Sequence, residues 1–193
     1  MTAAPPAPAT ERILDATIVA LSQYGARKLS MSDVAAIAGV SRPTLYRYYQ
    51  TKDDLLGALA RHEQRRFVDG LAAAIGAVRS ASDRLDAALH YIVGFLDDYA
   101  PRRLVELEPG FVLDRLAQLL PAQRDTLDRL LGDALANSPP VRAGKVSTTG
   151  VSELLLRVAM SHYLLPHPDP DELLRTLQAL LGGRAKGAPR ARR

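Results

Sequence analysis

The short stretch AGVS constrains this chain more than any other part of its sequence. Before it, Ser30 and Asp33 form an S-x-x-D capping box that predicts the start of a short helix, and Gly39 predicts its end. After it, Ser41 is a good N-cap, and Pro43 is tolerated in the first turn of a second short helix. Two helices of about two turns each, joined by a tight glycine-containing turn, are typical of a helix-turn-helix.

The segments on either side of these two helices are also predicted to be helical. A first helix is expected from Glu11 to Gly25, with Thr10 as its N-cap. Thr51 and Asp54 form a second capping box, which predicts a fourth helix directly after the helix-turn-helix. The sequence therefore predicts that the N-terminal part is a three-helix domain followed by a fourth helix.

The remaining sequence carries helical spacing of apolar residues and no convincing period-2 alternation. Helices are predicted within 82–100, 111–120, 121–138, 151–165 and 171–181, and a short helix or irregular turn is predicted within 101–110. We predict an all-α fold with a helix-turn-helix domain over 10–56 and a helical domain over 57–183. Residues 1–9 and the basic tail 184–193 are expected to be disordered.

The charge is unevenly distributed along the chain. Residues 1–66 carry nine basic and six acidic side chains, residues 67–183 eleven and fifteen, and residues 184–193 five and none. This asymmetry indicates that only part of the molecule faces a polyanion. The tail serves either solubility or a sequence-independent contact with DNA.

Several classes of protein are disfavoured by what the sequence contains. It has no cysteine, no apolar run long enough for a bilayer span, and no signal-peptide pattern, so a cytoplasmic protein is expected. No phosphate loop, nucleophile elbow or HExxH motif is present, so neither enzymatic activity nor a cofactor is expected. The four histidines lack metal-ligand spacing, so no metal is expected.

The second helix of a helix-turn-helix enters the DNA major groove with its N-terminal residues at the base edges. Arg42 is placed there to contact guanine, and Lys52 begins the following helix, where phosphate is favoured. Leu45 and Tyr49 share one helical face and are expected to point inward. The predicted DNA-contacting residues are Ser30, Ser32, Arg42, Pro43, Thr44, Tyr46, Arg47, Tyr48 and Lys52.

The segment LSMSDVAAIAGVSRPTLYRYYQTKDDLLGAL resembles the DNA-binding domain of the tetracycline-repressor (TetR) family of bacterial regulators. The resemblance covers about residues 10–60 and rests on AGVS, TLYRYY and KDDLL in order and at fixed spacing. Tyr49 departs from the family, which usually carries Phe there. The resemblance implies a second helical domain that encloses a small-molecule pocket and dimerises through its last two long helices.

An aromatic stripe follows in the second domain, where Tyr91, Phe95 and Tyr99 recur every four residues. Such a stripe belongs either to the core or, as the resemblance implies, to a ligand pocket. The candidate ligand-binding residues are Phe67, Tyr91, Phe95, Tyr99 and Phe111. Because few polar groups accompany them, we expect a small hydrophobic effector such as an acyl chain or an apolar drug.

The last two predicted helices are candidates for a dimer interface. Segment 151–165 is apolar on nearly every side, which indicates burial on several sides, and segment 171–181 carries a narrower stripe of leucines. Two such helices from each of two copies would form a four-helix interface. The candidate residues are Leu155, Val158, Ala159, His162, Leu173, Leu174, Leu177 and Leu181.

Taken together, the sequence favours a repressor that binds a palindromic double-stranded operator as a homodimer and is released by the effector. One alternative is an architectural or partner-controlled DNA-binding protein without a small ligand. Another is a helical lipid-binding or enzymatic protein. A cavity of a few hundred Å³ in the second domain would favour the first hypothesis.

Overall fold

The computed structural model describes residues 8–98 and 102–182, which are helical apart from turns and short connections. Residues 1–7 and 183–193, which include most of the two ends expected to be disordered, lie outside the described part. The all-α prediction is confirmed. The helices are α1 (Ala9–Lys28), α2 (Met31–Ala38), α3 (Arg42–Tyr48), α4 (Lys52–Gly76), α5 (Ala81–Asp97), α6 (Arg102–Leu107), α7 (Pro109–Ala136), α8 (Pro139–Arg142), α9 (Thr148–Leu164) and α10 (Pro170–Leu181).

Contacts divide the described chain into two compact units. Unit 1 comprises 8–66 and 102–115, and unit 2 comprises 67–98 and 116–182. Unit 1 therefore includes α6 and the start of α7, which the sequence-based division places in the second domain. Both α4 and α7 begin in unit 1 and continue as single helices into unit 2.

The start of α1 differs from the prediction, and its end contains a kink. Pro8 stands at the N-cap position without a side-chain hydrogen bond, so Thr10 does not cap the helix. Gly25 has φ 76° and ψ 166°, values that end the regular helix there, as predicted, and redirect the last turn. Leu29 N–H then donates to Gly25 O at 3.1 Å.

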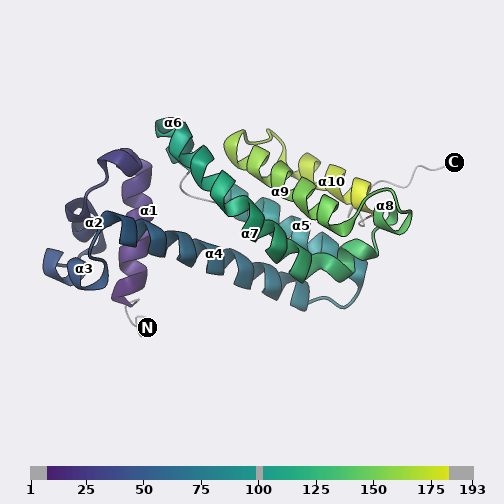
Figure 1. The fold of residues 1–193 in the computed structure, drawn as a ribbon, viewed down its shortest axis with the longest axis horizontal. Coiled ribbons are helices and arrows are strands. Elements are labelled where there is room, and N and C mark those ends of the chain that lie inside the picture. The colour runs from purple at the N-terminus through teal and green to yellow at the C-terminus, as the bar shows by residue number, and fades with distance from the viewer. Residues whose placement is uncertain (1–7, 99–101, 183–193) are drawn as a thin grey trace, which may run out of the picture. The chain divides into compact units, whose positions relative to one another are not determined.

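The helix-turn-helix is formed by the capping residues that the sequence indicated. Gly39 is left-handed at φ 64°, and the N–H of Val40 donates to Ala35 O at 3.0 Å, which closes α2 in a Schellman arrangement. Ser41 Oγ accepts from Thr44 N–H at 3.2 Å and starts α3. In unit 1, α2 packs on α1 and α3 packs on α2 (Figure 1).

The core of unit 1 is built from residues of α1, α2, α3 and α4. Ile13, Val34, Leu45 and Leu55 are fully buried within one hydrophobic cluster. Leu45 is the buried residue of α3, as predicted, and holds that helix against the cluster. Burial of a leucine contributes roughly 2 kcal/mol, so this contact fixes the position of α3.

Unit 2 contains a second hydrophobic cluster, in which α9 and α10 both pack on α5 (Figure 1). The predicted break at Pro121 is wrong, because α7 is continuous from Pro109 to Ala136. A proline in a helix interior loses one hydrogen bond and crowds the preceding turn. Here Pro121 is exposed, while Leu127 and Leu131 beyond it are buried in the cluster, and this burial sustains the helix across the proline.

Candidate nucleic-acid interface and effector site

The outer face of α3 presents most of the predicted DNA-contacting residues to solvent. Arg42, Pro43, Tyr46, Arg47 and Tyr48 are exposed. A helix held by one buried residue and exposing two guanidinium groups and two phenols is suited to contact a polar, anionic surface. The predicted inner residue Tyr49 packs against the core cluster of unit 1.

Neighbouring aromatic rings order the arginine at the end of α3. The Cζ atom of Arg47 lies 5.5 Å from the centroid of the Tyr48 ring, within cation–π range. The Tyr48 and Tyr49 rings are 6.5 Å apart. Burial raises the pKa of Tyr49, although Arg61 and Arg65 oppose this effect, so its phenol stays neutral at physiological pH. Through its cation–π contact, the Tyr48 ring helps to position the Arg47 guanidinium.

Among the remaining predicted DNA-contacting hydroxyls, those of Ser30 and Thr44 take part in hydrogen bonding at helix N-termini. Ser30 Oγ accepts from Asp33 N–H at 3.2 Å and donates to the carboxylate of the same residue. Thr44 Oγ1 lies 2.8 Å from Ser41 Oγ. Ser30 is exposed, whereas Ser32 and Thr44 are half-buried. Ser30 and Thr44 therefore have a structural function that holds without DNA.

Lys52 lies at the N-terminus of α4, but its ammonium points to the last turn of α1. Its Nζ donates to Ala26 O at 2.9 Å, to Arg27 O at 3.3 Å and to Leu29 O at 3.4 Å. An ammonium has three N–H donors, so these carbonyls match its donors in number. This arrangement favours a positioning role for Lys52 over the phosphate contact predicted from sequence.

Three of the five candidate ligand-binding residues form an aromatic cluster in unit 2. The centroid of the Phe67 ring lies 5.8 Å from that of Tyr91 and 5.2 Å from that of Phe95, and Tyr91 and Phe95 are 5.8 Å apart. The Tyr91 hydroxyl lies against Gly70, where a Cβ atom would collide with it. All three rings are half-buried.

The other two candidates do not join this cluster. Phe111 belongs to unit 1 and is 38% exposed. Tyr99 lies outside the described residues. Spacing along the helix therefore brought Tyr91 and Phe95 together, while the grouping with Phe111 relied on composition alone.

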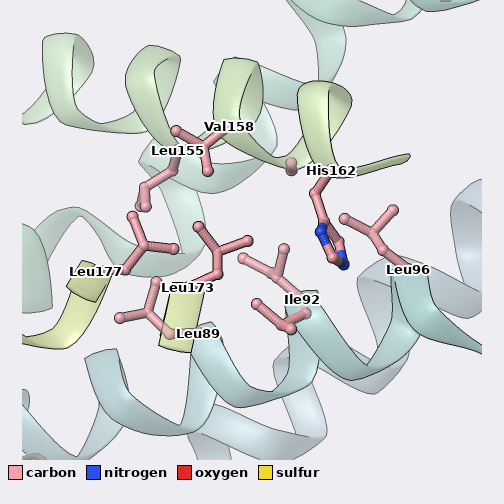
Figure 2. Close-up of a pocket in the computed structure, with 10 residues that line it drawn as sticks. Leu89, Ile92, Leu96, Leu155, Val158, His162, Leu173 and Leu177 are labelled. Atoms are coloured by element: carbon pink, nitrogen blue, oxygen red, sulfur yellow. The ribbon is translucent and has the colours of Figure 1, made fainter. Parts of the chain in front are cut away.

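A small apolar cavity lies between α5, α9 and α10 (Figure 2). Its volume is about 10 Å³, which is room for one water molecule at most. It is therefore far smaller than a ligand pocket of about 300 Å³ or more. Its lining residues are Leu89, Ile92, Val93, Leu96, Leu155, Val158, Ala159, His162, Leu173 and Leu177.

His162 is the polar member of this lining and is 3% exposed. Its Nδ1 accepts from the backbone N–H of His167 at 3.1 Å, and its Nε2 lies 2.9 Å from Asp97 Oδ1. Because Nδ1 accepts, the proton of the neutral ring belongs on Nε2, which donates to Asp97. His162 thus ties α9 to the end of α5 and to the turn before α10. Across residues 8–98 and 102–182, no three metal-ligating side chains gather.

The predicted dimer residues lie mainly on the inner side of α9 and α10. Six of the eight line the cavity just described, and the other two, Leu174 and Leu181, are buried in the cluster of unit 2. The large apolar residues exposed on these two helices are instead Leu154 and Leu180, at 55% and 66%. Because the sequence of α9 is apolar on nearly every side, it does not indicate which side packs against the core of the same chain.

Comparisons with known proteins agree with this architecture. Residues 13–59 match the family model "Bacterial regulatory proteins, tetR family". The chain is 41% identical over 103 residues to the HTH-type transcriptional repressor LfrR of Mycolicibacterium smegmatis, covering 53% of this chain and 51% of that protein. The chain thus spans about half the length of this curated relative, and less of the others that it matches.

Two solved structures share the fold over nearly the whole chain. The fatty acid degradation regulator FadR from Bacillus halodurans has a TM-score of 0.71 at 20% identity, covering 93% of this chain and 98% of that one. FadR from Bacillus subtilis in complex with stearoyl-CoA has a TM-score of 0.67 at 17% identity, covering 91% and 99%. At these identities the likeness is one of fold. Among the described helices, none combines the length and apolar character that a bilayer span requires.

Proposed function

We propose that this chain, a member of the tetR family of bacterial regulatory proteins by its N-terminal domain, is a transcriptional repressor that binds operator DNA as a homodimer and is released by a small apolar ligand. The observation that carries the proposal is the helix-turn-helix of α2 and α3. Leu45 is buried and holds α3 against the core, while Arg42 and Arg47 are exposed to solvent.

On DNA, α3 lies in the major groove with its N-terminus at the base edges. Arg42 is placed to bind guanine, and Pro43 and Thr44 lie beside it for apolar contact with a thymine methyl group. Tyr46, Arg47 and Tyr48 then reach the groove wall and the phosphates. Lys52 is omitted from this set because its ammonium donates to the carbonyls of α1.

A two-fold homodimer presents two recognition helices and therefore reads a palindrome. The exposed leucines of α9 and α10, Leu154 and Leu180, support these helices as the contact surface. Isolated exposed leucines are common on monomers, but here they lie on the two helices for which the family architecture implies dimerisation.

The effector is proposed to enter unit 2 near the aromatic cluster of Phe67, Tyr91 and Phe95. These half-buried rings provide apolar contact area for a ligand. The acyl-CoA bound by FadR of Bacillus subtilis supports an acyl chain as the ligand class. The ligand acts only through its differential affinity for the DNA-binding and released states.

A second candidate is a DNA-binding protein controlled by a partner or by no effector. The cavity between α5, α9 and α10 favours it, because a volume of about 10 Å³ cannot hold an acyl chain there without rearrangement of the helices. Native mass spectrometry of the purified protein distinguishes the two. A co-purified small molecule of constant mass supports the first, and a bare protein whose affinity for DNA no acyl-CoA changes supports the second.

DNA binding is tested with a duplex selected from a random library by the full-length protein. Arg42→Ala and Arg47→Ala each remove one guanidinium from α3, whereas Arg79→Ala removes an exposed one that lies outside unit 1. We expect about a tenfold or greater loss of affinity for the first two variants and little change for the third. Equal affinities for all three variants, or no selected duplex at all, would refute the proposal.

A further inference from the structure

The last turn of α1 is held from one side by a carboxylate that is distant in sequence. Glu108, between α6 and α7, accepts a hydrogen bond through Oε1 from the backbone N–H of Arg27 at 2.8 Å. Its side chain lies against Gly25, where a Cβ atom would stand 2.6 Å from the same oxygen. Gly25 thus provides both the positive φ and the space that this contact requires.

The same turn is held from the other side by Lys52, which donates to the carbonyls of Ala26, Arg27 and Leu29. The Glu108 carboxylate therefore accepts from an N–H group of the five-residue segment Gly25–Leu29, and the Lys52 ammonium donates to carbonyl groups of the same segment. Hydrogen bonds with a charged partner are about twice as strong as neutral ones. Because Lys52 begins α4 four residues after α3 ends, this segment connects Glu108 to the recognition helix.

The backbone of Glu108 is fixed by the helices on both sides of it. Its N–H donates to Leu104 O at 2.8 Å, and its carbonyl accepts from Val112 N–H at 3.2 Å. Displacing the first turn of α7 therefore moves the carboxylate that holds Arg27. The same helix continues to Ala136 in unit 2.

We propose that Glu108 is a positioning residue for DNA binding, and that its hydrogen bond to Arg27 is the contact through which α6 and α7 control the recognition helix. This inference rests on the proposed DNA-binding function. While the bond is intact, the turn Gly25–Leu29 keeps Lys52, and with it the end of α3, in place. A change in unit 2 that turns or draws back α7 removes the carboxylate and loosens this turn.

The contact is suited to being broken. The second carboxylate oxygen of Glu108, Oε2, is buried and has no hydrogen-bond partner among the described residues. A buried acceptor without a partner is costly and offsets part of the gain from the Arg27 bond. The balance lets a modest displacement of α7 release the carboxylate.

The test compares Glu108→Ala, Glu108→Gln and Glu106→Ala in the full-length protein with a duplex selected by the wild type. Glu106 lies two residues before Glu108, on α6, and is exposed, so it is a matched control for the loss of one negative charge. We expect Glu108→Ala to weaken DNA binding about tenfold with an unchanged slope of log affinity against log salt, because no phosphate contact is lost. Glu108→Gln retains an oxygen acceptor and restores most of the affinity.

If only the net charge of the protein mattered, the change in DNA affinity would have the opposite sign. Removing an acid would strengthen DNA binding, and the two Glu108 variants and the Glu106 variant would then behave alike. Either this result, or wild-type affinity for Glu108→Ala, would overturn the proposal while leaving the proposed DNA-binding function intact.

Hydrogen exchange of the Arg27 amide tests the contact without DNA. The amide should exchange faster in Glu108→Ala than in Glu106→Ala, with exchange in α5 unchanged. Unchanged exchange at Arg27 would refute the contact itself. If no duplex is selected even by the wild type, the proposed function fails, and the exchange arm still decides whether Glu108 holds the turn.

Discussion

Replacing Leu154 and Leu180 together by glutamine should dissociate the proposed dimer while leaving each chain folded. The two side chains are 55% and 66% exposed in the single chain. Burying a whole leucine side chain is worth about 2 kcal/mol. Burying the exposed fractions of both leucines in both copies therefore contributes about 5 kcal/mol to the free energy of dimerisation. Glutamine keeps the helix propensity of leucine and removes most of this term.

A loss of about 5 kcal/mol weakens the dimer by roughly three orders of magnitude or more. Sedimentation equilibrium over a range of protein concentrations measures this constant, and urea unfolding of the monomer checks the fold. The control is Leu113→Gln, because Leu113 is 52% exposed but lies outside α9 and α10. Dimerisation through α9 and α10 is refuted if the double variant and the control show the same dimer dissociation constant, or if the wild type is monomeric.

Three further predictions concern the two units separately. Leu45→Ala should cost about 2–5 kcal/mol in the free energy of unfolding by urea, because Leu45 is fully buried, and a cost below about 1 kcal/mol would contradict its anchoring role. Lys52→Met should lower the melting temperature without changing the salt slope of DNA binding, whereas a slope reduced by about one would reveal a phosphate contact instead. The Glu172 backbone N–H lowers the pKa of Asp169, which caps α10, so the cap stabilises the fold above about pH 4 and this contribution is lost as pH falls through the lowered pKa. Asn caps without titrating, so Asp169→Asn should flatten the acid limb of the stability profile, and an unchanged limb would show that the cap does not contribute.

The helix-turn-helix could be predicted because the interactions that form it are local. Ser41 caps α3 three residues away, Thr51 and Asp54 bond to each other across one turn, and Gly39 ends α2. Each depends on residue types at a fixed short spacing, which a sequence displays directly. Burial of Leu45 follows from the same helical periodicity.

The contacts around the turn Gly25–Leu29 could not be predicted in this way. Glu108 and Arg27 are separated by 81 positions, and no periodicity links a carboxylate to a distant backbone N–H. Lys52 was assigned to phosphate because its place at a helix start suits an anion, yet its long side chain reaches back across 23–26 residues to carbonyls. Both contacts depend on tertiary packing, and a phosphate contact of Lys52 stays a prediction.

The sides of α9 and α10 were predicted ambiguously for a related reason. An apolar side chain suits a core and a dimer seam equally well, so Leu155 and Leu177 were assigned to the interface although they line a cavity within the chain. Pro121 shows the reverse case, in which a local helix breaker is overridden because burial of Leu127 and Leu131 holds α7 together. Burial, which sequence patterns suggest only in part, settles such positions.

Hydroxyl-radical footprinting of the full-length protein on its selected duplex is the sharpest test of palindrome recognition through α3. We expect two protected half-sites of the same sequence, related by two-fold symmetry and centred about one helical turn, or a multiple of it, apart. Protection should be lost with Arg47→Ala and kept with Arg79→Ala. A single asymmetric footprint, or the same protection on unselected DNA, would contradict a dimeric regulator that reads a palindrome through α3.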